Sequence, residues 1–291
     1  MYRSILVPLD GEVASEHALP VALSIARRCG ADITLATVHT GSPGDIKAQE
    51  QARVYLDRVI HLLPKAPDVA FQRAQLVGPV AETLADYASE SEIDLVVMTS
   101  NPRGLLSKLW SGNVTDQFVR LSPAPVLIVH PRGEEADFDR DIVFDHILIN
   151  LDGPMGHDEI LAPTVALGQL MNAQFTLLRV TPSASQLNIA SPELPVYTET
   201  NERSIAEEMQ TEGKAYLEAI AEPLRAQSLS VGTEAIIDGP GDEALDFSKQ
   251  HGVDLIAMTS RERSELSRWL LGRVTDKELR AAGLALLIYK V

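Results

Sequence analysis

Two short apolar segments of this chain each end in an aspartate followed by a glycine. The first closes on Asp10-Gly11 after Ile5-Leu-Val-Pro-Leu, and the second closes on Asp152-Gly153 after Ile147-Leu-Ile-Asn-Leu. An aspartate at the end of a buried strand can accept hydrogen bonds from a ribose, ligate Mg²⁺ or cap the following helix. Taken alone, the residue type leaves these three roles open.

Both segments belong to an internal repeat. Asp94-Leu-Val-Val-Met-Thr-Ser recurs as Asp254-Leu-Ile-Ala-Met-Thr-Ser, and Gly112-Asn-Val-Thr-Asp recurs as Gly272-Arg-Val-Thr-Asp, both at an offset of 160 residues. The aspartate-glycine segments recur at an offset of 142, so the second copy carries 18 extra residues. We expect most of them in an inserted surface loop at about 181–200, a stretch rich in Pro, Ser, Thr and Asn.

Each copy alternates short apolar runs with longer amphipathic ones, the pattern of a parallel sheet covered by helices. The runs are apolar on consecutive residues, as strands buried on both faces should be. The predicted strands are 4–9, 33–39, 69–76, 95–98 and 126–129, then 146–151, 175–180, 231–237, 255–258 and 284–289. The predicted helices are 14–29, 46–63, 80–89 and one from about Gly112, then 160–171, 206–226, 242–250 and 274–281.

These elements predict two tandem α/β domains with open sheets. The segment 134–144 is charged, contains no apolar periodicity and follows Pro131 and Gly133, so we interpret it as a linker. Domain 1 is then 1–133 and domain 2 is 145–291, each of ordinary size.

Charge and composition exclude several classes of protein. The chain has 291 residues with 25 Lys+Arg against 41 Asp+Glu, a formal charge of −16. An acidic surface repels phosphate backbones and anionic lipids, so we expect no nucleic-acid partner and no membrane partner. The one cysteine, Cys29, cannot form an intrachain disulfide and is expected to be a small packed residue. With no signal-peptide core and no run long enough to span a bilayer, the expected location is cytoplasmic.

Other chemical signals are weaker. His17 and His157 follow the two aspartates closely, so either could touch a ligand or act as acid or base, but we favour surface histidines. Neither has the second His or Cys at short spacing that a metal site needs. Six basic residues in 261–280 form either an anion site or, as we favour, a solvated helix face. The sequence contains no Gly-x-Ser-x-Gly, His-Glu-x-x-His or Walker A motif.

The order of elements and the repeated motifs resemble the universal stress protein family over the whole chain, as two consecutive copies. The residues that carry the resemblance are 5–11, 94–100, 105–115 and 123–129, with their second-copy counterparts. The resemblance implies a five-stranded parallel sheet in each domain, with the adenine-nucleotide alpha-hydrolase-like, Rossmann-like fold. It also implies that the domains pair through their last strands as an internal pseudo-dimer.

Nucleotide-binding members of the family carry a phosphate loop of pattern Gly-x2-Gly-x9-Gly-Ser/Thr. By resemblance its positions fall on Thr99, Pro102, Gly112 and Asn113 in the first copy, and on Thr259, Glu262, Gly272 and Arg273 in the second. Only the third glycine of the pattern is present in each copy. Pro102 has no N–H to donate to a phosphate, and Glu262 adds a negative charge, so the motif is degenerate in both copies.

The resemblance also assigns the adenine and ribose positions. Pro8, Asp10 and Val38 match them in the first copy, whereas in the second copy Asn150 replaces the proline and Asp152 and Val180 remain. Any nucleotide binding is therefore expected to be weak and to favour the first domain, with ATP or AMP as the ligand. Asp10 would ligate Mg²⁺ only together with a nucleotide.

The sequence thus favours a non-catalytic stress-response protein of two domains that binds a nucleotide or another small anion. One alternative is a slow ATPase or adenylate-using enzyme on the same architecture, since fold does not fix function. Another is a scaffolding protein whose pockets are vestigial, with the 181–200 insertion as the partner-binding segment. A protein partner and further homodimerisation are left open.

Overall fold

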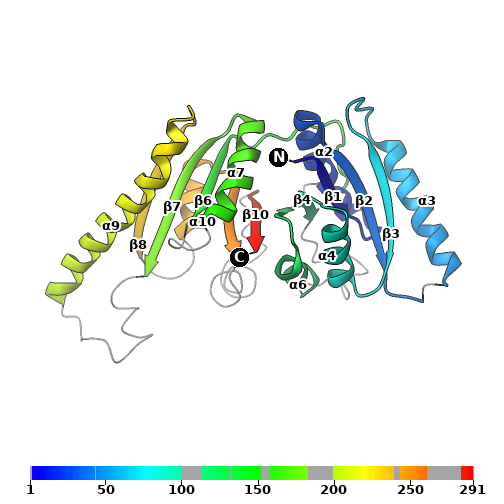
Figure 1. The fold of residues 1–291 in the computed structure, drawn as a ribbon, viewed down its shortest axis with the longest axis horizontal. Coiled ribbons are helices and arrows are strands. Elements are labelled where there is room, and N and C mark those ends of the chain that lie inside the picture. Colours follow the sequence, from blue (N-terminus) through cyan, green and yellow to red (C-terminus); the bar gives the residue numbers. More distant parts are fainter. Residues whose placement is uncertain are drawn as a thin grey trace.

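A computed structural model of the chain contains a single sheet of ten strands (Figure 1). It describes residues 2–42, 44–99, 113–131, 133–151, 157–182, 199–238, 243–260 and 283–290. The strand order is β3-β2-β1-β4-β5-β10-β9-β6-β7-β8, so each copy of the repeat contributes five neighbouring strands. Figure 1 shows α3 and α9 at the two far sides of the molecule, with β10 near the middle.

The first half follows the predicted order of elements. Its bounds are β1 (Ser4–Pro8), α1 (Val13–Glu16), α2 (Ala18–Cys29), β2 (Asp32–His39), α3 (Ile46–Leu62), β3 (Phe71–Val77), α4 (Val80–Glu90), β4 (Leu95–Thr99), α6 (Asn113–Leu121) and β5 (Val126–Val129). The predicted helix 14–29 is divided at His17 into α1 and α2. Pro20 has no N–H for the Glu16 carbonyl, which removes one bond of a continuous helix at this point.

The second half repeats the same plan. Its described elements are β6 (His146–Asn150), α7 (His157–Met171), β7 (Gln174–Pro182), α9 (Glu199–Arg225), β8 (Val231–Asp238), α10 (Glu243–His251), β9 (Leu255–Ser260) and β10 (Ala285–Lys290). Helix α9 has 27 residues against 17 in α3, so part of the 18-residue insertion lengthens this helix. The centre of the expected loop, 183–198, and the expected helix 274–281 lie outside the described residues.

The two halves join through their last strands, as the resemblance implies. Strands β5 and β10 are antiparallel, with Leu127 opposite Leu287 and Ile128 opposite Leu286. Every other strand pair in the described sheet is parallel. All four of these leucine and isoleucine side chains are fully buried, so the junction belongs to the core.

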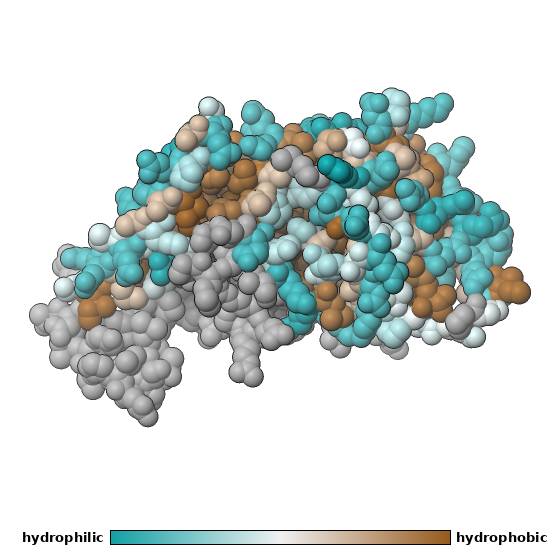
Figure 2. Space-filling view, in the orientation of Figure 1, coloured by the Kyte–Doolittle hydropathy of each residue, from teal (hydrophilic) through white to brown (hydrophobic). Residues whose placement is uncertain are grey.

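The sheet is covered on both faces, and each layer of core runs through both halves. One layer packs α2, α3, α7 and α9 against residues such as Val7, Leu35 and Ile149. The other packs α4, α6 and α10 against residues such as Leu6, Met98 and Leu148. Successive strand residues alternate between the two layers, which explains the continuous apolar runs. Figure 2 shows an apolar area between α7 and α9, helices whose partly exposed side chains include Leu161, Leu170, Ile220 and Leu224.

The repeated aspartates Asp94 and Asp254 have a structural role in the sheet. Asp94 Oδ2 accepts hydrogen bonds from the backbone N–H groups of Arg3 (2.7 Å) and Ser4 (3.2 Å). Asp254 Oδ2 accepts them in the same way from Asp145 (2.8 Å) and His146 (3.0 Å). Each carboxylate therefore fixes the start of the central strand of its own half, β1 or β6.

The expected linker is held against the first half at its C-terminal end. Asp141 forms a two-bond ion pair with Arg28 of α2, with both N–O distances at 2.7 Å, and the pair lowers the pKa of Asp141. The Ile142 N–H donates to Ser24 Oγ at 2.8 Å. Beside the β5–β10 pairing, a direct contact between the halves is the Tyr2 hydroxyl, which donates to the Pro163 carbonyl of α7 at 2.7 Å.

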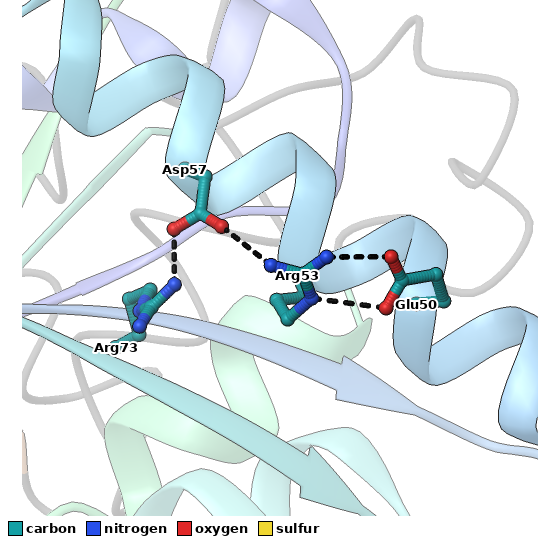
Figure 3. A network of polar contacts seen from close by, with 4 residues as sticks. All are labelled: Glu50, Arg53, Asp57 and Arg73. Atoms are coloured by element: carbon teal, nitrogen blue, oxygen red, sulfur yellow. Dashed lines mark hydrogen bonds and ion pairs between the residues drawn. The ribbon is translucent and has the colours of Figure 1, made fainter.

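Polar networks tie the outer helix of each half to its edge strand. Figure 3 shows Asp57 of α3 between Arg53 on the same helix and Arg73 on β3, with Glu50 bonded to Arg53. In the second half, Glu218 of α9 accepts bonds from Arg225 and from the Thr233 hydroxyl on β8. Charged and hydrogen-bonded side chains thus lie along both edge strands. An edge strand with exposed apolar residues would instead be prone to aggregation.

Candidate functional site

The candidate site of the first half lies where its strand order reverses. β1 is flanked by β2 on one side and β4 on the other, so the chain crosses over in opposite directions from this point. In open α/β sheets, ligands bind beyond the carboxyl ends of the strands at such a position. Asp10 follows β1, and Thr99 is the last residue of β4.

Strand register brings four of the predicted site residues to this edge. Pro8 is paired with Ala36, so continuing the β1–β2 register sets Asp10 level with Val38. Leu6 is paired with Val96, so continuing the β1–β4 register sets Leu9 level with Thr99. Residues that are far apart in the sequence therefore meet along three neighbouring strand ends.

These side chains divide between the two faces of the sheet. Val38 packs with the core layer of α4 and α6, and Pro8 shares that face because it is two residues after Leu6. Thr99 is two residues after Val97 and so faces the layer of α1 and α2, where it is buried. At the end of β4 it is thus the backbone of Thr99, and not its hydroxyl, that can reach a ligand on the α6 side.

Asp10 closes a turn with one oxygen of its carboxylate. Its Oδ1 accepts the Glu12 N–H at 3.0 Å, and its own N–H donates to Ser15 Oγ at 3.4 Å. The Ser15 hydroxyl donates to the Glu12 carbonyl at 2.8 Å. Asp10 thus forms a turn just before α1 and does not cap the helix, whose N-cap residue is Glu12, and Oδ2 has no hydrogen bond to any described residue.

The corresponding edge of the second half has different chemistry. Asn150 ends β6, is buried, and shares a face with Val180 because Leu148 and Val180 pack in the same layer. Thr259, near the end of β9, is half-buried and faces the opposite layer, as Thr99 does. A buried amide thus stands in the second half where the first half has the proline ring.

Several predicted site residues cannot be placed. Gly112, Asp152, Gly272 and Arg273 lie outside the described residues, as do the basic residues of 261–280. Asn113 is the first residue of α6, but its side chain is not described. The same is true of the His157 side chain at the start of α7.

A group of side chains that sequence reasoning missed lies beside the Asp10 turn. Glu16, the last residue of α1, has a side chain only 7% exposed and forms an ion pair with Arg58 of α3 at 2.6 Å. The Arg58 guanidinium lies over the Tyr55 ring, with its carbon 5.3 Å from the ring centre. One signal was available, since Glu16 lies three and seven residues before the buried Leu19 and Leu23, on the apolar side of the segment.

The Tyr55 hydroxyl completes this group. Burial and the neighbouring Glu16 carboxylate raise the pKa of Tyr55, and the hydroxyl lies near Ser15 as well. It makes no hydrogen bond of normal geometry to the described residues. The helix α3 thus presents an aromatic hydroxyl and a guanidinium to the short helix that carries the Asp10 turn.

His17 lies at the junction of the two halves. It borders a cavity of about 290 Å³ that is also lined by Val21, His130, Phe144 and Leu284. Partial burial lowers the pKa of His17. The expectation of a surface histidine is therefore correct only in part, because the ring is half-buried.

The described part of the chain contains neither a metal-binding cluster nor a helix that could span a membrane. Within it, no group of three or more His, Cys, Asp or Glu side chains could hold a metal ion. None of the described helices is both long and apolar enough to cross a bilayer. Cys29 is half-buried, and its Sγ lies 3.2 Å from the Ile25 carbonyl, in agreement with a packing role.

Comparisons by family model, by sequence and by structure all lead to the same family. The model of the "Universal stress protein family" matches residues 1–130 and 144–290. Universal stress protein Sll1654 of Synechocystis is 27% identical over 135 residues, which is 44% of this chain and 86% of that protein. A crystal structure of a universal stress protein from Archaeoglobus fulgidus covers 99% of this chain and 96% of its own, at 17% identity and a TM-score of 0.65. A putative universal stress protein from Pseudomonas aeruginosa covers 99% and 93%, at 17% identity and a TM-score of 0.56.

Proposed function

Because the chain belongs to the universal stress protein family, we propose that it is a stress-response protein whose first half binds an adenine nucleotide, ATP or AMP. The observation that carries the proposal is the meeting of Pro8, Asp10 and Val38 at the point where the strand order reverses. Pro8 and Val38 form an apolar wall on the α6 side, suited to a base. The Oδ2 oxygen of Asp10 is available to a ribose hydroxyl.

The binding is weak because the phosphate loop is degenerate. Pro102 offers no N–H where the family pattern has its second glycine, and Thr99 is not a glycine either. What remains for the phosphates is the N-terminus of α6 at Asn113, since unpaired amides at a helix start favour anions. Most of the binding energy would then come from the base and ribose, so AMP and ATP should bind with similar affinity.

Mg²⁺ enters this proposal only with a triphosphate. Asp10 supplies a single carboxylate, and the described residues around it provide no group of three metal-ligating side chains. A lone carboxylate is a sparse ligand set for Mg²⁺, which is usually held by one or two carboxylates together with substrate phosphates. The Asp10 carboxylate would thus complete a coordination sphere supplied mainly by ATP and water.

Isothermal titration calorimetry at low salt tests the site directly. ATP and AMP are titrated into the full chain and into the variants Asp10→Ala and Asp152→Ala, which are equivalent positions of the two copies. We expect one nucleotide per chain, lost in Asp10→Ala and kept in Asp152→Ala. Absence of nucleotide heat in the wild type, or loss only in Asp152→Ala, would overturn the proposal.

The proposal makes the protein a binder and not an enzyme. A cytoplasmic location remains an expectation from the sequence, and so does the absence of nucleic-acid and membrane partners. The second half has a buried Asn150 at the base position, so we propose that it does not share the nucleotide specificity of the first. Its ligand, if small and anionic, would depend on the segment with Gly272 and Arg273.

A further inference from the structure

The ion pair between Glu16 and Arg58 joins two elements that no strand pairing connects. Glu16 ends the four-residue helix α1, and Arg58 lies toward the C-terminal end of α3, 42 residues later. The Glu16 side chain is 7% exposed whereas that of Arg58 is 53% exposed. A nearly buried carboxylate needs a partner, and Arg58 is its only ion-pair partner among the described residues.

The contact is continuous with the Asp10 turn. Ser15, next to Glu16, accepts the Asp10 N–H and donates to the Glu12 carbonyl, while Asp10 accepts the Glu12 N–H. A helix as short as α1 has little stability of its own. Its position therefore depends on its surroundings: the Asp10 turn at its start, α2 and β4 beside it, and Arg58 with Tyr55 at Glu16.

We propose that Arg58 and Tyr55 are positioning residues that hold the Asp10 carboxylate in its ligand-binding orientation through Glu16 and Ser15. This inference rests on the proposed function, because it concerns the same site. In this arrangement α3 acts as a fixed support for α1. Without that support the Asp10 carboxylate samples several orientations, and ordering it again on binding costs free energy.

The second half lacks this device. When the two outer helices are aligned by their buried leucines, Leu56 and Leu217, Arg58 matches Ala219 and Tyr55 matches Tyr216, while the 142-residue offset pairs Glu16 with Asp158. Alanine cannot form an ion pair with an acid, and the guanidinium over the Tyr216 ring belongs to Arg179 of β7, not to α9. The support is thus specific to the half that keeps Pro8, which makes the two halves unequal in a second, independent way.

A ligand pair that differs only in the ribose tests the proposal. AMP and 2′,3′-dideoxy-AMP are titrated by calorimetry into the wild type and Arg58→Ala. If Asp10 holds the ribose hydroxyls, the wild type prefers AMP, and Arg58→Ala should lose about tenfold in AMP affinity with little change for the dideoxy compound, because only the oriented carboxylate is lost. A uniform loss for both ligands, or no loss, would overturn the positioning role.

Further variants separate positioning from folding. Arg225→Ala removes an exposed arginine–glutamate pair from the equivalent helix and should leave both affinities unchanged. Arg58→Lys keeps the charge and should restore part of the preference, while Tyr55→Leu, which removes the ring beneath the guanidinium, should weaken it. If Arg58→Ala proves too unstable to titrate, Tyr55→Leu and Glu16→Gln, which removes the other charge of the ion pair, decide instead, and an unaltered preference in both would contradict the inference. A wild type that binds neither ligand would refute the proposed function itself.

Discussion

Replacing Asp94 with alanine should destabilise the protein without affecting nucleotide binding. The carboxylate accepts two backbone N–H groups at the start of β1, at 2.7 and 3.2 Å. Hydrogen bonds to a charged group contribute about 1.5–3 kcal/mol each when protected from water. Arg3 is exposed and Ser4 only half-buried, so water replaces part of the loss. We therefore expect Asp94→Ala to lower the free energy of unfolding by about 2–3 kcal/mol.

The repeat supplies a matched variant for this prediction. Asp254 makes the same two bonds, but one of its donors is the N–H of His146, a residue that is only 7% exposed. Asp254→Ala should then cost at least as much as Asp94→Ala, because a better shielded N–H loses its acceptor. Urea unfolding followed by circular dichroism gives both values from the midpoint at constant slope.

Two outcomes would refute this reasoning. A change below about 0.5 kcal/mol in both variants would mean that the aspartates do not anchor the central strands. Loss of AMP binding in Asp94→Ala, at unchanged stability, would instead assign this carboxylate to the ligand site. Asp94→Asn is the useful intermediate, since it keeps an acceptor oxygen without the charge and should cost about half as much.

Three further predictions follow from other parts of the molecule. The pKa of Glu218 is lowered from 4.5 to about 2 by Arg225 and Thr233, so its contribution to stability is present above pH 4.5 and is lost as the pH falls toward 2. The melting temperatures of the wild type and Glu218→Gln should thus differ at pH 6 and converge near pH 2. In Gly168→Ala the new methyl group would lie 2.2 Å from Phe175 Cζ, so we expect a loss of about 1–3 kcal/mol in urea unfolding, partly restored in the double variant with Phe175→Leu. Incubation with ATP and Mg²⁺ for hours should release no more phosphate from the wild type than from Asp10→Ala, and release that depends on Asp10 would support a slow ATPase.

The sequence alone predicts most of the fold because the repeat supplies each element twice. Strands such as Val126–Val129 are apolar on consecutive residues and short, which distinguishes them from the amphipathic helices. Pro20 marks the break between α1 and α2 in the sequence. Whether the helix actually breaks there depends on whether it tolerates the loss of one backbone hydrogen bond. The N-terminal extension of α9 to Glu199 was not predicted, because the residues before Ala206 lack a regular apolar stripe.

The candidate site is less accessible to sequence reasoning. Pro8, Asp10 and Val38 could be nominated because they lie at predicted strand ends and match family positions. The opposite orientation of Thr99 follows from strand alternation once the register is fixed. The Glu16–Arg58 pair could not be predicted, because only the packing of α3 on the sheet brings the two residues together. They are 42 residues apart, so no local sequence pattern indicates the contact.

The antiparallel pairing of β5 and β10 within one chain also bears on how such a protein can change over time. In a symmetric dimer of identical subunits every substitution occurs twice, so both sites must accept it. Here the pairing is intramolecular, which makes it independent of protein concentration and lets each half accumulate its own substitutions. An arginine at position 58 and an alanine at the equivalent position 219 can coexist in this chain, whereas a homodimer would carry the same residue at both positions. The covalent connection thus frees one half to lose a ligand while the other retains it.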